Sequence, residues 1–130
     1  KILAVQNNQT TDNEKILIEM KKMAEEFKEL LLNKSINIES IGEFLHHGWH
    51  LKRRLANTIS STHIDEIYSS AIKSGALGGK IVGAGGGGFM FFLVDPNNRI
   101  KLINKLNSLG GRVYNFQFVS DGMKGWYISK

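Results

Sequence analysis

The chain has 130 residues, 42% apolar and 22% charged, a composition that fits one globular domain with a single core. It has no cysteine and no apolar run near the roughly 18 residues that cross a bilayer, which excludes disulfides, thiolate metal sites and a membrane-spanning helix. The net charge of +5 and the pI of about 9.5 favour anionic partners such as phosphorylated small molecules. The lysines are scattered, however, so we expect no nucleic-acid or membrane partner, and the absence of cysteine agrees with a cytoplasmic protein.

The first predicted element is an amphipathic helix that ends near Asn33. Lys1 lies partway into an apolar segment and no methionine precedes it, so we expect a piece of a larger protein. Thr11 to Glu14 have the spacing of a capping box, which predicts where this helix begins. Apolar residues then recur every three or four positions, at Ile16, Met20, Met23, Phe27, Leu30 and Leu31.

Two further helices are predicted before the pattern changes. The second runs from about Ile38 to Asn57, and its core face carries Ile41, Phe44, Gly48, Leu51, Leu55 and Ile59. Its opposite face carries Glu43, His47, His50 and Arg54, which we expect in solvent, while Trp49 and Lys52 fall on the border. The third is short, with Thr62 as its cap and Gly75 at its end.

The rest of the chain reads as strands around one more helix. Apolar runs at 79–82 and 89–94 flank a glycine run, and Asp95-Pro96 opens a helix that ends at Gly110-Gly111. Candidate strands follow at 114–118 and 125–128. Strands joined by short turns pair antiparallel, so we predict an α+β fold: an antiparallel four-stranded sheet with helices packed on one face.

The most informative segment is the glycine run Gly83-Ala84-Gly85-Gly86-Gly87-Gly88. Ordering glycine is entropically costly, and a plain hairpin needs only two or three special positions. Consecutive unshielded amides form a nest that suits a phosphate. The dinucleotide fingerprint requires a following helix, whereas Phe89 begins a strand, and no Lys-Ser or Lys-Thr completes a P-loop. We therefore predict a loop against a phosphate or another glycine-rich loop, with a wide bulged hairpin as the alternative.

Residues 80–89 resemble the third conserved motif of the GHMP kinases, the superfamily of galactokinase, homoserine kinase and mevalonate kinase. Within it, the chain resembles most the D-glycero-D-manno-heptose 7-phosphate kinase family, from about Thr11 onward. The segments that carry this narrower resemblance are Gly42-Glu43-x-Leu45, Trp49-x-x-Lys52-x-x-Leu55, Ile64-Asp65-x-Ile67-Tyr68 and Gly75-Ala76-Leu77-Gly78-Gly79-Lys80.

The resemblance implies the ferredoxin-like C-terminal domain, residues 1–130, of a two-domain kinase. In that family the N-terminal domain binds most of ATP and Mg²⁺ and carries the acidic catalytic residues, none of which matches a position here. Phosphoryl transfer depends on positioning and charge neutralisation, so this part alone is expected to be inactive and to hold no catalytic residue. Its expected partners are its own N-terminal domain, ATP and a sugar phosphate, with Gly83 to Gly88 supporting the ATP-phosphate loop.

Three side chains are candidates for substrate binding. Lys80 precedes the glycine run by three residues, and Trp49 and Lys52 lie one helical turn apart. An indole face can stack on a sugar ring while an ammonium holds its phosphate. The alternatives are a core position for Trp49 and a surface-lying side chain for Lys52, and Arg53 is a weaker candidate.

Histidines and aromatics suggest two other sites, which we do not favour. His46 and His50 are four residues apart, but no third metal ligand is evident, so surface histidines and no metal site are predicted. Tyr114, Phe116 and Phe118 alternate as in RNA-binding sheets, yet Asn115 and Gln117 lie between them where basic residues would be needed, which favours a covered core face.

The leading functional hypothesis is an ATP-dependent kinase that phosphorylates the anomeric hydroxyl of a heptose 7-phosphate, as the resemblance implies. A fucose-type or other small-molecule kinase of the superfamily is the near alternative. A non-catalytic α+β module that binds an anion or nucleic acid is the alternative from another class, which the positive charge permits.

Overall fold

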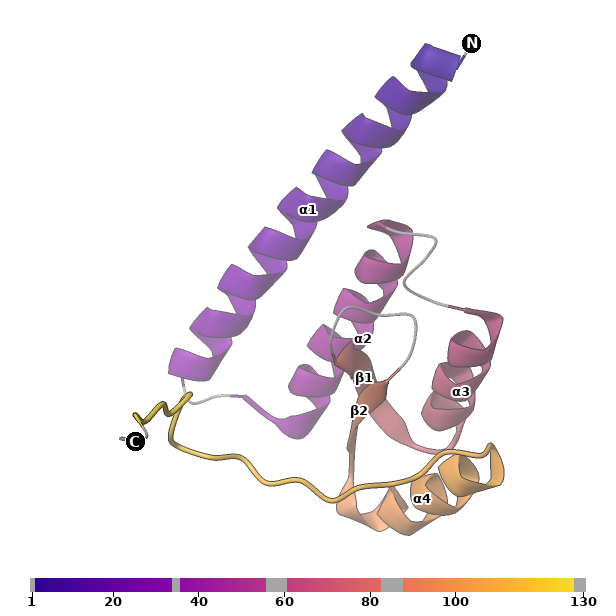
Figure 1. The fold of residues 1–130 in the computed structure, drawn as a ribbon, viewed down its shortest axis with the longest axis vertical. Coiled ribbons are helices and arrows are strands. Elements are labelled where there is room, and N and C mark those ends of the chain that lie inside the picture. Colours follow the sequence, from indigo (N-terminus) through magenta and orange to yellow (C-terminus); the bar gives the residue numbers. More distant parts are fainter. Residues whose placement is uncertain (1, 34–35, 56–60, 83–87, 128–130) are drawn as a thin grey trace.

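The computed structural model describes residues 2–33, 36–55, 61–82 and 88–127, and within residues 2–11 it describes the backbone only (Figure 1). The fold of these residues is α+β, as predicted. Its elements in chain order are α1 (Ile2–Leu32), α2 (Ile38–Leu55), α3 (Thr62–Lys73), β1 (Ala76–Val82), β2 (Phe89–Val94), the 3₁₀ turn η1 (Pro96–Asn98) and α4 (Arg99–Ser108). None of the described helices is both long and apolar enough to cross a membrane.

The helix ends follow local capping chemistry, with two differences from the sequence expectation. Helix α1 continues through the supposed capping box at 11–14, because the residues before it are helical as well. Helix α3 is capped one residue earlier than expected: the Ser61 hydroxyl accepts from the Ile64 amide at 3.3 Å. The Asp95 carboxylate caps η1 as predicted, accepting from Asn97. Gly75 ends α3 with a positive φ of 101°.

The predicted four-stranded sheet is not formed by the described residues, which contain two strands. β1 and β2 pair antiparallel from Ala76 opposite Val94 to Val82 opposite Phe89, with an irregularity at Leu77. The candidate strand at 114–118 and residues 125–127 of the other run without regular structure, and 128–130 lie outside the described residues. A strand needs a backbone partner for its amides and carbonyls, and alternation of apolar residues does not supply one.

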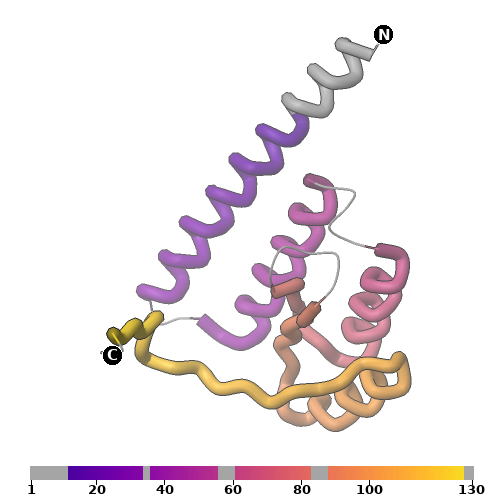
Figure 2. The backbone as a smooth tube through the Cα atoms, viewed as in Figure 1, coloured from indigo at the N-terminus to yellow at the C-terminus, as the bar shows by residue number. Residues whose placement is uncertain are grey.

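The C-terminal segment, residues 111–127, passes along the outside of the domain (Figure 2). Two ring contacts join it to β2: the Phe89 and Tyr114 rings lie 5.8 Å apart, and those of Phe91 and Phe116 lie 5.3 Å apart. Every residue of the segment is exposed. The prediction of a covered core face for Tyr114, Phe116 and Phe118 is therefore wrong, because none of the described residues covers their outer side.

Helix α2 approaches β1 so closely that backbone meets backbone. A Cβ on Gly78 would overlap the carbonyl oxygen of Gly42 and lie 2.9 Å from the His46 backbone nitrogen. A Cβ on Gly42 would in turn overlap the Leu77 side chain. Glycine at 42 and 78 is thus required by space, and this contact fixes where β1, and the hairpin that it begins, sits on the helices.

The core lies between α2, α3, α4 and one face of the hairpin. Its two clusters are joined through Ile72 and Phe92, which pack against both. The buried members are Trp49, Ile64, Tyr68 and Ile81 in the first cluster and Ala71, Ala76 and Leu102 in the second. Helix α1 packs on α2 through Phe27 and Phe44, whose rings lie 5.0 Å apart, on the side of α2 away from α3 (Figure 1).

Candidate functional site

The two strands of the hairpin flank the glycine run. Its last strand pair, Val82 and Phe89, brackets the run, of which residues 83–87 lie outside the described residues. Gly88 is described: its φ is 105°, and, apart from its chain neighbours, no heavy atom of the described residues lies within 4 Å of the place a Cβ would take. Gly88 therefore adopts a backbone conformation that other residues rarely adopt, at an exposed position open to an approaching group.

The two candidate lysines lie on different elements and differ in exposure. The Lys80 side chain is exposed on β1, opposite Phe91. Lys52 is half-buried near the end of α2. Among the described residues neither ammonium has an ion-pair partner, whereas the neighbouring Arg53 binds the Asp65 carboxylate of α3 at 2.7 Å. The lysines can thus serve an anion, and Arg53 already holds two helices together.

Trp49 is placed in the core. Its side chain is 1% exposed and stacks on Tyr68, with ring centroids 4.9 Å apart and an angle of 20° between the planes. Its indole nitrogen has no hydrogen-bond partner among the described residues. The helical wheel put Trp49 on the border of α2 because a wheel shows one helix only, and α3 covers the side that the wheel left open. The core interpretation is therefore favoured over sugar stacking.

A chain of side-chain hydrogen bonds runs from α3 to α2, and sequence reasoning missed it. The Tyr68 hydroxyl of α3 lies 2.9 Å from Nδ1 of His46 on α2. Nε2 of His46 in turn lies 3.2 Å from Nε2 of His50. The spacing of the two histidines was visible in the sequence, but nothing there indicates that Tyr68 joins them.

The ionisation of these groups follows from their surroundings. Burial raises the pKa of Tyr68 to about 12, although the Gly79 amide works against the shift. The pKa of His50 is lowered, first by burial and then by the nearby His46, Arg53 and His47. Both groups are therefore neutral at pH 7, and no cluster of three metal-ligating side chains exists among the described residues.

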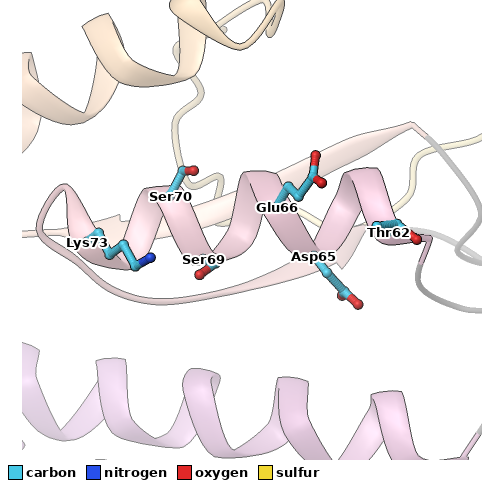
Figure 3. Close-up of a pocket in the computed structure, with 6 residues that line it drawn as sticks. All are labelled: Thr62, Asp65, Glu66, Ser69, Ser70 and Lys73. Atoms are coloured by element: carbon cyan, nitrogen blue, oxygen red, sulfur yellow. The ribbon is translucent and has the colours of Figure 1, made fainter.

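A shallow hollow lies elsewhere, along α3. Figure 3 shows its side chains spread along the helix, with Glu66 and Ser70 on one side and Asp65 and Ser69 on the other. Thr62 and Lys73 complete the lining. None of the predicted site residues lines it, and all six lining residues belong to α3. It is a groove along one helix surface and does not define the candidate site.

Comparison with known proteins gives the geometry a context. The family model for the C-terminal part of GHMP kinases matches residues 16–112. The D-glycero-alpha-D-manno-heptose 7-phosphate kinase of Campylobacter jejuni is 39% identical over 89 residues, which are 68% of this chain and 26% of that protein. The mevalonate kinase of Thermococcus gammatolerans is 32% identical over 85% of this chain and 33% of its own length. That of Pyrococcus furiosus is 31% identical over 84% of this chain and 33% of its own length. The chain thus spans about a quarter to a third of these relatives.

Proposed function

The chain belongs to the GHMP kinases, whose C-terminal domain it carries, and we propose that it forms one wall of the cleft of an ATP-dependent small-molecule kinase. The match over residues 16–112 is the observation that carries this proposal. Because the matched part makes up only 26% of one relative and 33% of another, ATP and Mg²⁺ are assigned mainly to an N-terminal domain.

The glycine run is proposed to support the ATP-phosphate loop of that N-terminal domain. Support comes from the hairpin, which holds Val82 and Phe89 as a pair, and from the exposed, left-handed Gly88. Residues without side chains let two loops approach each other's backbone, and exposed amides favour an anion. The transition state of phosphoryl transfer spreads charge over equatorial oxygens, so a rigid wall of amide donors would stabilise it.

The acceptor is proposed to be a heptose 7-phosphate, phosphorylated at its anomeric hydroxyl. This finer assignment depends on the 39% identity with the Campylobacter jejuni enzyme. We assign Lys52 and Lys80 to its phosphate, since Lys80 is exposed, Lys52 is half-buried, and neither ammonium group has an ion-pair partner among the described residues. Trp49 supports them indirectly, because its buried indole fixes the helix that carries Lys52.

A mevalonate-type acceptor is the second candidate. The mevalonate kinases match a larger share of this chain than the heptose phosphate kinase does, although at lower identity. The two acceptors differ in one decisive respect: heptose 7-phosphate already carries a phosphate and mevalonate carries a carboxylate. Lysine can bind either anion, so the choice must come from turnover.

Coupled ATP turnover by the full-length protein tests both candidates. We expect activity with D-glycero-D-manno-heptose 7-phosphate and little with mevalonate or unphosphorylated heptose. Replacing Lys80 or Lys52 by Met should raise KM for the sugar phosphate by about tenfold, the effect of losing one charge-assisted contact. The matched control is Lys101→Met on the exposed face of α4, which should leave KM unchanged. Preference for mevalonate would replace the acceptor, and no ATP turnover with any acceptor would overturn the kinase assignment.

A further inference from the structure

His46 and His50 bring two ring nitrogens together on one side of α2. The residues are four positions apart, so their side chains lie one helical turn apart on the same face of the helix. Their Nε2 atoms are 3.2 Å apart, and the two rings meet edge to face with centroids 4.5 Å apart. Both rings therefore turn the same nitrogen atom toward each other.

The separation of these two nitrogens is close to the one that a transition-metal ion requires. Histidine nitrogens bind Zn²⁺ at about 2.0–2.1 Å, so two such ligands of a tetrahedral ion are about 3.3–3.4 Å apart. The observed separation of 3.2 Å is within a few tenths of an ångström of this value. Small rotations of the two side chains would therefore place both nitrogens on one ion, and the pair is preorganised for chelation.

The orientation of the His46 ring is fixed from α3. Nδ1 of His46 lies 2.9 Å from the Tyr68 hydroxyl, and the two rings stack with centroids 5.8 Å apart. Tyr68 is 4% exposed and stacks on Trp49 as well, so its hydroxyl is held in place. A metal-bound histidine usually donates the hydrogen of its other ring nitrogen to such an oxygen, which fixes its tautomer and its orientation. Tyr68 occupies the place of that partner.

The histidine pair is accessible, and a neighbouring positive charge is already neutralised. His50 is exposed and His46 is half-buried, so an ion can reach the two nitrogens and water can complete its coordination. Arg53, three residues beyond His50, binds the Asp65 carboxylate at 2.7 Å. This ion pair reduces the repulsion that the charge of a bound metal ion would meet there.

We propose that His46 and His50 form a bidentate site for a divalent transition-metal ion such as Zn²⁺, with Tyr68 as the residue that orients His46. Sequence reasoning predicted no metal site because no third protein ligand is evident, and the described residues hold no group of three metal-ligating side chains. Water supplies the remaining ligands, as at metal sites with open positions. Imidazole suits Zn²⁺, Cu²⁺ and Ni²⁺, whereas Mg²⁺ and Ca²⁺ prefer oxygen. The inference does not depend on the proposed kinase function.

Coordination changes the tautomers of the two rings without releasing a proton. In the metal-free pair of neutral rings, one Nε2–H donates to the Nε2 atom of the other ring. A metal ion needs the lone pair of both Nε2 atoms, so each ring then carries its proton on Nδ1. The Nδ1 proton of His46 is donated to the Tyr68 hydroxyl oxygen, and that of His50 to water. The nitrogen NMR signals of the two rings therefore report metal binding directly.

Calorimetric titration with ZnCl₂ at pH 7.5 tests the site on the full-length, untagged protein without nucleotide. We expect one zinc equivalent whose affinity falls more than about a hundredfold in His50→Gln, because loss of an outer partner alone costs roughly ten- to a hundredfold. His47→Gln is the matched control, since it removes the histidine next to His46 and leaves the pair intact. Equal affinity in wild type and His50→Gln, equal losses in both variants, or no zinc binding by wild type would overturn the site.

Long-range ¹H–¹⁵N spectra identify the ligands. Zn²⁺ should shift the Nε2 signals of His46 and His50 and leave those of His47 in place. Tyr68→Phe should weaken zinc binding about tenfold at unchanged stoichiometry, whereas Tyr127→Phe, at an exposed position, should have no effect. Circular dichroism of the metal-free variants confirms that they are folded before titration. Shifts confined to other histidines, or unchanged affinity in folded Tyr68→Phe, would contradict the proposed arrangement.

Thermal unfolding gives a second measurement of the same site. Excess Zn²⁺ should raise the Tm of wild type but not that of His50→Gln, because an ion that binds the folded state stabilises it. MgCl₂ at the same concentration is the control, and it should not distinguish the two proteins because Mg²⁺ prefers oxygen ligands. An equal rise of Tm with Zn²⁺ in both proteins would place the bound zinc elsewhere and overturn the inference.

Discussion

The two tryptophans of this chain lie in regions that differ in almost every physical respect. Trp49 belongs to the packed region formed by α2, α3 and β1, where its side chain is 1% exposed. Trp126 belongs to the C-terminal segment and is 78% exposed. Both regions are rich in aromatic residues, but they differ in the elements packed against them. Helices cover one face of the hairpin in the first region, whereas no described element covers the second.

This difference shows what holds the fold together. In the packed region one aromatic ring meets several others, as Tyr68 does with Trp49, His46 and Phe92. In the C-terminal segment the Phe116 ring touches Phe91 and Phe118, and all residues of the segment stay exposed. Stability is therefore expected to reside in the first region, and substitutions of the same kind should have unequal effects in the two.

The largest difference in loss of stability is expected between alanine substitutions of the two tryptophans. Trp49→Ala should lower the free energy of unfolding by about 3–5 kcal/mol, because removal of the buried indole leaves a cavity in the core. Trp126→Ala should change it by less than about 0.5 kcal/mol. Urea denaturation followed by far-UV circular dichroism measures both. Comparable losses of stability would mean that the C-terminal segment is packed in solution, and would contradict the difference between the two regions.

Sequence reasoning succeeded where one element's own pattern decides the outcome. The 3.6-residue periodicity placed α2 and α3 within a few residues, and Asp95-Pro96 and Gly75 marked ends correctly. These features are local, since a cap or an amphipathic face depends on neighbours along the chain.

It failed where the outcome depends on a partner distant in sequence. The alternation of Tyr114, Phe116 and Phe118 favours a strand, but no described residue gives it a backbone partner. The helical wheel puts Trp49 at the border of its helix, because a wheel cannot show that Tyr68 of α3 packs on Trp49 in the folded structure. The hydrogen bond between Tyr68 and His46 joins α3 and α2, and no spacing in one element could have indicated it.

A second inequality is expected for glycines that look equivalent in the sequence. Gly78→Ala should cost about 1–3 kcal/mol, because the new methyl group would overlap the Gly42 carbonyl and the helix must move away from the strand. Gly122→Ala is the matched control in the C-terminal segment, where no described residue apart from the chain neighbours has an atom within 4 Å of the new Cβ. Thermal unfolding of both variants gives the comparison. A Gly78→Ala protein as stable as wild type would mean that α2 and β1 are not in backbone contact.

A smaller inequality is expected for two serines. Ser61 caps α3 through its hydroxyl, so Ser61→Ala should lower the free energy of unfolding by about 1 kcal/mol. Ser120, exposed in the C-terminal segment, is the control, and Ser120→Ala should have no measurable effect. Chemical denaturation of the two variants at pH 7.5 measures the two free energies of unfolding. Equal values would show that the Ser61 cap contributes nothing to stability.

The smallest expected effect is the contribution of His50, in the packed region, to the pH dependence of stability. Burial and nearby positive groups lower the pKa of His50 in the folded protein, so the unfolded chain binds more protons as the pH falls below the usual pKa of histidine. The free energy of unfolding should therefore decrease as the pH falls below about 6.5. The contribution of His50 to this decrease should become constant below the pKa of His50 in the folded protein. His50→Gln should flatten the decrease, while His63→Gln, at an exposed position of α3, should leave it as in wild type. Denaturation midpoints across the pH range from acid to neutral measure the difference, and parallel curves for wild type and His50→Gln would assign the acid response to other groups.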